Sequence, residues 1–324
     1  MKKLILRLGQ MLCFLSFILM LFHYSLILKY AKEGLSVWAS CVLPLLLPFI
    51  LLSKFWIRYK IPELLFNQMQ KIFSKKTVIS ISLPIFLLGL CTGFPIGAIL
   101  ISHYYQTGIL NRKHAESLLP LASFVSPMFV MGYVHSQINL SGTSWLYYLL
   151  CLYLPVLLCY LFIHCFIMNK QEKKVYTKIS ILSKKEPVKS IVYALNKPSD
   201  TPTLTEEVFL PSLEVIFIIG IYMMIFSILS GMLTSLPLFQ TPALTFLLAN
   251  LEVTTGIHLL ATRQICTLTL QHALIAATTS FGGMCTMAQV QTVISSSDLS
   301  LKKYVLIKTL TALLSFLLCI FLLH

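Results

Sequence analysis

Two glutamates, Glu252 and Glu214, stand well inside apolar stretches of this chain. An ionisable side chain in such a stretch is costly and usually faces a cavity or a partner. The segment 249–256 also carries amide and hydroxyl groups, so we predict that it contacts a substrate or an ion. The alternative is a glutamate that caps a helix N-terminus, where the helix dipole favours an anion. Glu214 stands near the start of its stretch, which favours an interfacial position. The predicted binding residues of the segment are Asn250, Glu252, Thr255 and Gly256.

A second set of candidate residues surrounds a proline. Gly89, Gly93 and Gly97 recur at a spacing of four, which would place them on one helix face, where small residues let backbones approach closely. Pro95 lacks an N–H group and would break that helix. The glycines fit helix packing alone, and they also fit a hairpin tip that presents backbone groups to a ligand. The binding residues in this second interpretation are Gly93, Phe94, Pro95 and Gly97.

Serine, proline and glycine interrupt two further apolar stretches. Such groups can form hydrogen bonds between helices. They can also line a cavity, because irregular backbone at membrane depth is tolerated only where it is buried in protein or faces a cavity. Both interpretations stay open, and these residues complete the predicted site: Ser123, Ser126 and Pro127 in one stretch, and Ser280, Gly282, Gly283 and Gln289 in the other.

Motifs of catalysis and metal binding are not found in the sequence. The eight histidines show neither HxxxH nor HExxH spacing, and the nine cysteines form no CxxC pair. A GxSxG elbow, a Walker A loop and a Rossmann fingerprint are also missing. We therefore expect no metal, no cofactor and no enzymatic activity, and an ATP-driven pump within this chain is excluded. A membrane enzyme stays open as an alternative, which would need a nucleophile–base pair brought together only in space.

The composition is that of a membrane protein. Hydrophobic residues make up 57% of the 324 residues and charged residues 11%, against about 25% charged residues in ordinary soluble domains. A mean hydropathy of +0.84 predicts an all-α polytopic membrane protein. The net charge of +14 comes from basic residues in short loops, which indicates membrane orientation rather than nucleic-acid binding.

Basic residues also predict the orientation. With the N-terminus in the cytoplasm, 22 of the 25 Lys and Arg residues lie inside, among them Lys302, Lys303 and Lys308, as the positive-inside rule requires. This holds only if Thr77–Tyr105 and Ala243–Thr262 each enter and leave on one side, as re-entrant hairpins. The expected full spans are Leu4–Leu28, Gly34–Ile57, Leu118–Val134, Trp145–Met168, Val208–Leu233, Thr267–Ile294 and Tyr304–Leu323.

The two halves of the chain follow one plan in opposite orientations. Each has a span with Leu-Pro-x-Leu (from Leu43 and from Leu210), a broken hairpin, a broken span and a last clean span. Such inverted repeats place a transporter's binding site at the membrane midplane, between broken helices. The alternative is two unrelated halves that look alike because Leu and Pro are common. The predicted regions are an N-terminal signal anchor (1–33), a first repeat (34–168), a Lys-rich cytoplasmic linker (169–207) and a second, inverted repeat (208–324).

Five segments carry a resemblance to a known family. They are Leu43-Pro44 to Pro48-Phe49; Gly93-Phe94-Pro95-Ile96-Gly97-Ala98; Ser126-Pro127-Met128-Phe129-Val130; Leu251-Glu252 to Gly256; and Ser280-Phe281-Gly282-Gly283 to Gln289. Taken in this order, they resemble the YlbJ family of sporulation integral membrane proteins, which carries the nucleoside recognition (Gate) domain. The chain departs from the family at Ser123-Phe124, where family members have two asparagines.

The resemblance implies a transporter-like fold and a role in spore formation. We therefore expect a transporter or channel-like protein for an unidentified small solute, in a bacterial plasma membrane. The expected partners are the lipid bilayer and that solute, without nucleic acid, and the oligomeric state is left open. The alternative is a membrane scaffold for spore-envelope assembly that transports nothing, in which the surface loops would matter more than the buried polar groups.

Overall fold

The computed structural model describes residues 21–59, 61, 64, 79–138, 145–163, 203–263 and 266–323. Within these ranges the secondary structure is helical and contains no strand. Six described helices are long and apolar enough to cross a membrane, so the prediction of an all-α polytopic protein is confirmed. They are Tyr24–Arg58, Arg112–Gln137, Trp145–Phe162, Thr205–Thr234, Leu268–Ile294 and Leu301–Leu323.

The first long helix is continuous from α2 (Tyr24–Val37) through the π-helical turn η1 (Trp38–Val42) to α3 (Leu43–Arg58). The sequence predicted two separate spans, at 4–28 and 34–57. In the structure, the described part of the first span continues as helix into the second. The rest of the predicted anchor lies outside the described residues, as does most of the linker 169–207. Another π-helical turn, η4 (Thr205–Phe209), precedes α13 (Leu210–Thr234).

Helices of the first half end where glycine, serine and proline interrupt the apolar pattern. The break after Thr92 covers Gly93 to Pro95, and the break after Ala122 covers residues 123–126. The elements are α5 (Ile79–Thr92), α6 (Ile96–Gln106), α7 (Arg112–Ala122), α8 (Pro127–Phe129), η2 (Val130–Val134), α9 (His135–Gln137) and α10 (Trp145–Phe162).

Helices of the second half are interrupted in a comparable way. One break covers residues 250–252, and the other falls at Gly282, which has a positive φ of 84°. The elements after α13 are η5 (Pro237–Gln240), α14 (Pro242–Ala249), α15 (Val253–Thr262), α16 (Leu268–Phe281), α17 (Gly283–Ile294) and α18 (Leu301–Leu323).

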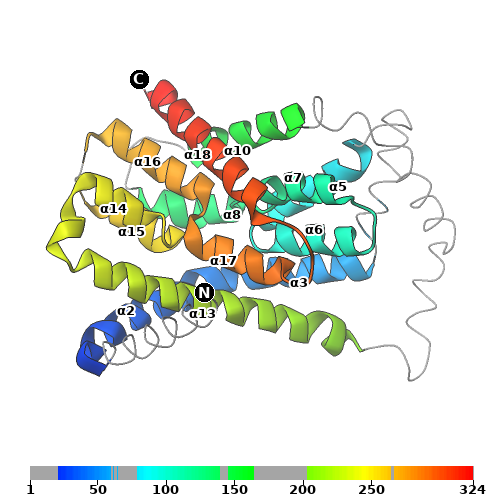
Figure 1. The fold of residues 1–324 in the computed structure, drawn as a ribbon, viewed down its shortest axis with the longest axis horizontal. Coiled ribbons are helices and arrows are strands. Elements are labelled where there is room, and N and C mark those ends of the chain that lie inside the picture. Colours follow the sequence, from blue (N-terminus) through cyan, green and yellow to red (C-terminus); the bar gives the residue numbers. More distant parts are fainter. Residues whose placement is uncertain are drawn as a thin grey trace, which may run out of the picture.

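The helix pairs α5–α6 and α14–α15 lie at opposite ends of the molecule (Figure 1). Helix α13 packs against α2 and α3, and α18 packs against α16, α7 and α10. Two apolar clusters result. The larger joins α5–α10 to α15–α18, and the smaller joins α3 and η1 to α13.

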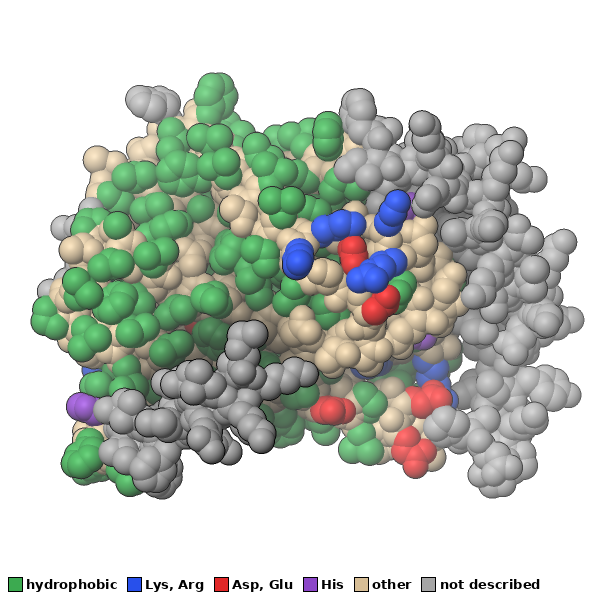
Figure 2. Space-filling model, viewed as in Figure 1, with side chains coloured by type: hydrophobic (Ala, Val, Ile, Leu, Met, Phe, Trp, Pro, Cys, Tyr) green, Lys and Arg blue, Asp and Glu red, His purple; other side chains and the backbone are tan. Residues whose placement is uncertain are grey.

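The outer surface fits a lipid environment. Large apolar side chains are exposed along α13 and α18, for example Phe217, Ile221, Leu306 and Leu313. Figure 2 shows hydrophobic side chains over much of one face and a group of charged side chains towards one end. Lys308 is an exception to the predicted arrangement of charge. It was counted with Lys302 and Lys303 on the cytoplasmic side, although it falls within the expected span Tyr304–Leu323, and it lies inside the molecule, only 1% exposed.

Candidate functional site

The tip of the α5–α6 pair packs directly against the end of α7. A Cβ atom on Gly97 would lie 2.1 Å from the carbonyl oxygen of Ala122, and one on Gly93 would lie 3.0 Å from Cβ of Ser126. Gly93 also has a φ of 82°, which favours glycine. Glycine at positions 93 and 97 therefore allows close backbone packing. This packing places the break at residues 93–95 against the break at residues 123–126.

The α14–α15 pair makes an equivalent contact with the break between α16 and α17. A Cβ on Gly256 would lie 1.9 Å from the carbonyl oxygen of Ala249, so the two short helices touch at the backbone. The N–H groups of Met284 and Cys285 donate to the carbonyls of Asn250 and Leu251, both at 2.9 Å. Two N–H groups in the first turn of α17, which have no partner within their own helix, thus bind the α14–α15 loop.

Glu252 is the N-cap of α15 and is 2% exposed. Its carboxylate accepts hydrogen bonds from the backbone N–H groups of Thr254, at 3.0 Å, and Thr255, at 2.7 Å. The Thr254 hydroxyl donates a third, at 2.5 Å. The alternative of a buried helix cap is therefore what the structure shows. The carboxylate stabilises the helix dipole and at the same time faces a cavity.

This cavity lies where the breaks of both halves meet. Its volume is about 30 Å³, and a single water molecule needs roughly 10–15 Å³ on the same measure. Pockets for drug-sized ligands are about 300–1,000 Å³, so this conformation accommodates water or an ion-sized solute. The lining residues are Val42, Leu45, Leu46, Gly93, Phe94, Ser126, Phe129, Ile219, Met223, Glu252, Val253, Thr254, Thr286 and Gln289.

The chain is 26% identical over 311 residues to the sporulation integral membrane protein YlbJ of Bacillus subtilis, an alignment that covers 86% of this chain and 73% of that protein. The resemblance to YlbJ-type proteins is supported. No protein-family model matches the chain, and no solved structure matches it. The Gate domain stays a prediction.

Five of the predicted site residues line the cavity: Gly93, Phe94, Ser126, Glu252 and Gln289. The others lie beside it and shape the breaks. Pro95, Gly97 and Pro127 belong to the tip of α5–α6 and the start of α8, and Asn250, Thr255, Gly256, Gly282 and Gly283 to the α14–α15 contact. Ser123 and Ser280 are fully buried, and their hydroxyls have no hydrogen-bond partner among the described residues.

Several lining residues were not predicted. Thr254 and Thr286 contribute hydroxyls, and Leu45 and Met223 contribute apolar walls from the long helices α3 and α13. Thr286 lies one helical turn after Gly282 and donates to its carbonyl at 2.9 Å, a spacing that could have revealed it. Nothing in the pattern of the two long helices distinguishes a residue that faces the cavity from one that faces lipid.

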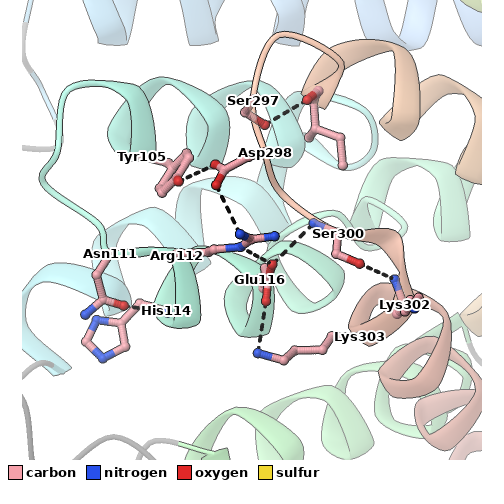
Figure 3. A network of polar contacts seen from close by, with 11 residues as sticks. Tyr105, Asn111, Arg112, His114, Glu116, Ser297, Asp298, Ser300, Lys302 and Lys303 are labelled. Atoms are coloured by element: carbon pink, nitrogen blue, oxygen red, sulfur yellow. Dashed lines mark hydrogen bonds and ion pairs between the residues drawn. The ribbon is translucent and has the colours of Figure 1, made fainter.

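A polar network joins the two halves away from the cavity (Figure 3). Arg112 contacts Glu116 at 2.9 Å and Asp298 at 3.1 Å, and Lys303 contacts Glu116 at 3.0 Å. The Tyr105 hydroxyl donates to Asp298. The loop before α18 is thereby fixed to the α6–α7 connection, and the basic residues Arg112 and Lys303 meet at Glu116.

Proposed function

We propose that this chain is a multi-pass plasma-membrane protein of sporulating bacteria that transports a small polar solute or ion. The observation that carries the proposal is the cavity beside Glu252, which the tips of α5–α6 and α14–α15 line together with the long helices α3 and α13. Polar groups at membrane depth mark solute pathways when they converge on a cavity. The similarity to YlbJ supports the sporulation part.

An inverted repeat is the architecture that best accounts for this convergence. In Figure 1, α2–α3 runs opposite to α13, α7–α8 opposite to α16–α17, and α10 opposite to α18. The pairs α5–α6 and α14–α15 would then be re-entrant hairpins from opposite sides, with tips that meet near the midplane. The gathering of Arg112, Lys303 and their partners at one end supports a cytoplasmic N-terminus under the positive-inside rule.

Transport also fits the chemistry of the lining better than catalysis does. The polar groups at the cavity are the Glu252 carboxylate, the hydroxyls of Ser126, Thr254 and Thr286, and the Gln289 amide. Glu252 and Thr254 bond to each other, and Thr286 donates to backbone carbonyls of the nearby break. None of these pairs is an activated nucleophile with a base, so the proposed function includes no enzymatic step, no nucleic acid and no cofactor.

The test is complementation of a sporulation-defective deletion strain of the native host. The variant Glu252→Gln keeps one acceptor oxygen for the α15 N-terminus but removes the charge. The matched control is Glu214→Gln, because Glu214 is exposed on α13. We expect heat-resistant spores to fall at least about tenfold for Glu252→Gln alone, at wild-type protein levels in the membrane.

Full sporulation with Glu252→Gln would overturn the assignment of Glu252 to the solute site. A third strain with residues 169–207 shortened tests the scaffold alternative. If only that strain fails, the chain acts through a partner that binds the linker, and crosslinking would replace solute-uptake screens as the next step.

A further inference from the structure

Lys308 is a buried basic residue that the proposed solute site does not use. It lies on α18, is 1% exposed, and its Nζ donates to the carbonyl of Ser280 at 3.3 Å. The Nζ also lies 4.5 Å from the ring centroid of Phe124 and 5.8 Å from that of Tyr304. One carbonyl and two aromatic faces thus surround this amine.

The described residues supply no acidic partner for Lys308. Glu116 of α7, the acidic residue on the neighbouring helices, is bound to Arg112 and Lys303. The other titratable groups on helices packed against α18 are Lys113 and His114 of α7, His272 of α16, and Tyr147, Tyr148, Cys151, Tyr153, Cys159 and Tyr160 of α10. None of them carries a negative charge in its ordinary state at neutral pH. Tyr304 and Cys319 lie on α18 itself. An ammonium buried without an anionic partner is expensive in free energy, so a lysine in such a place is usually kept for a function.

The surroundings of the Lys308 amine are suited to binding a proton rather than an anionic ligand. Lys308 does not line the cavity beside Glu252, so the amine faces packed side chains rather than a ligand-sized space. Carbonyl oxygens and aromatic faces both stabilise an ammonium, while a neutral amine can still donate to Ser280. The buried hydroxyls of Ser123 and Ser280, which have no partner among the described residues, stand next to the Phe124 ring and the Ser280 carbonyl.

Lys308 is connected to the solute site through the backbone. Ser280 stands two residues before Gly282, and the first turn of α17 beyond it binds the carbonyls of Asn250 and Leu251, next to Glu252. A positive charge on Lys308 strengthens its pull on the Ser280 carbonyl. Proton binding would therefore act on the α16–α17 break, which holds the α14–α15 tip.

We propose that Lys308 is a proton-binding site whose loading and release alter the α16–α17 break and couple proton movement to the solute cavity. The coupling rests on the proposed transport function, whereas the proton binding does not. The two parts are therefore tested by separate measurements.

Proton binding is measured by nitrogen NMR of the full-length protein, labelled with ¹⁵N-lysine and held in nanodiscs. The Lys308 signal is the one lost in Lys308→Met and retained in Lys302→Met, because Lys302 is exposed on the same helix. We expect the signal to change from that of a neutral amine to that of an ammonium as the pH is lowered across the range in which the protein stays folded. A signal that keeps one form throughout overturns the proposal. Lys308→Arg removes the same signal and serves for assignment if Lys308→Met does not reach the membrane.

Coupling is measured by sporulation of strains with Lys308→Met, which is never charged, and Lys308→Arg, which is always charged. We expect both to lose at least about tenfold in heat-resistant spores at wild-type protein levels, with Lys302→Met unaffected. Normal sporulation of either variant overturns the coupling. If Glu252→Gln fails in that case, the transport proposal stands without the proton. If Glu252→Gln is also normal, the transport site itself is wrong.

Discussion

Replacement of Gly256 by alanine tests whether the backbone contact within the α14–α15 pair builds the cavity. The added Cβ would lie 1.9 Å from the carbonyl oxygen of Ala249, whereas ordinary van der Waals contact begins at 3.4 Å. The two helices must therefore separate by about 1.5 Å at this point. The three nearest atoms, the O, C and Cα of Ala249, all belong to backbone, so no side-chain rotation relieves the contact.

The cost follows from two opposing effects. Overpacking a closed contact costs about 1–3 kcal/mol, and a clash with rigid backbone belongs at the upper end, about 3 kcal/mol. Alanine in a helix interior recovers about 1 kcal/mol relative to glycine. A net loss of about 2 kcal/mol lowers the thermal midpoint by roughly 3 °C, since the unfolding entropy is about 2.1 cal/mol/K per residue and the chain has 324 residues.

The assay is thermal unfolding of the purified protein in nanodiscs, with Gly132→Ala as the matched control. A Cβ on Gly132 would meet its nearest neighbour, Cδ1 of Leu45, at an unstrained 3.7 Å. We expect the control to match or exceed the wild type. The reasoning is refuted if Gly256→Ala is as stable as the control, because the α14–α15 pair would then not be closed at the backbone.

Two further predictions concern the polar network between the halves. Glu116→Gln removes the carboxylate that Arg112 and Lys303 share, and the loss of charge-assisted hydrogen bonds at a buried acceptor should lower the free energy of unfolding by about 1–3 kcal/mol. Thermal unfolding measures this loss, with Asp298→Asn, whose site is exposed, as the control. Equal stability of the wild type and Glu116→Gln would contradict the prediction. The hydrogen bond from Tyr105, with the nearby charge of Arg112, holds the pKa of Asp298 below its ordinary value. Its contribution to stability is therefore complete above about pH 3.9, the ordinary aspartate value, and is lost as the pH falls further through the lowered pKa. The midpoint of the wild type should then drop more than that of Asp298→Asn in this window, and parallel pH profiles would show that the contact contributes nothing.

The helix breaks could be predicted from sequence because the chemistry that ends a helix is local. Pro95, the pair Ser126-Pro127 and the pair Gly282-Gly283 each favour an interruption, and the structure has its breaks there. Proline alone does not decide it, because Pro48, Pro84, Pro120 and Pro155 lie inside helices. The continuity of α2 with α3 was missed. The polar residues Lys29, Lys32 and Glu33 suggested a loop, but they are tolerated on an exposed stretch of helix at the end of a span.

Lys308 shows where one-dimensional charge counting fails. Its sequence neighbours Lys302 and Lys303 are exposed, and the three lysines look like one cytoplasmic flank. Lys308 lies about one and a half helical turns beyond Lys303, which is far enough to turn it from the network at Glu116 towards Ser280 and Phe124. Only the packing of α18 against α16 and α7 distinguishes the two environments.

The two interpretations of Glu252, as helix cap and as solute contact, lead together to a constraint on the solute. Three of the roughly four acceptor positions of the carboxylate are used by Thr254 and Thr255, and the helix dipole that would attract an anion is already balanced. The cavity therefore faces the part of the negative charge of Glu252 that these hydrogen bonds and the helix dipole do not balance. The charge of Glu252 would repel a negatively charged solute here, whereas it would attract a cation or a neutral hydrogen-bond donor. A reconstituted protein should accordingly distinguish solutes by charge before it distinguishes them by shape, and Glu252→Gln should weaken that charge preference even if it leaves the α15 cap intact.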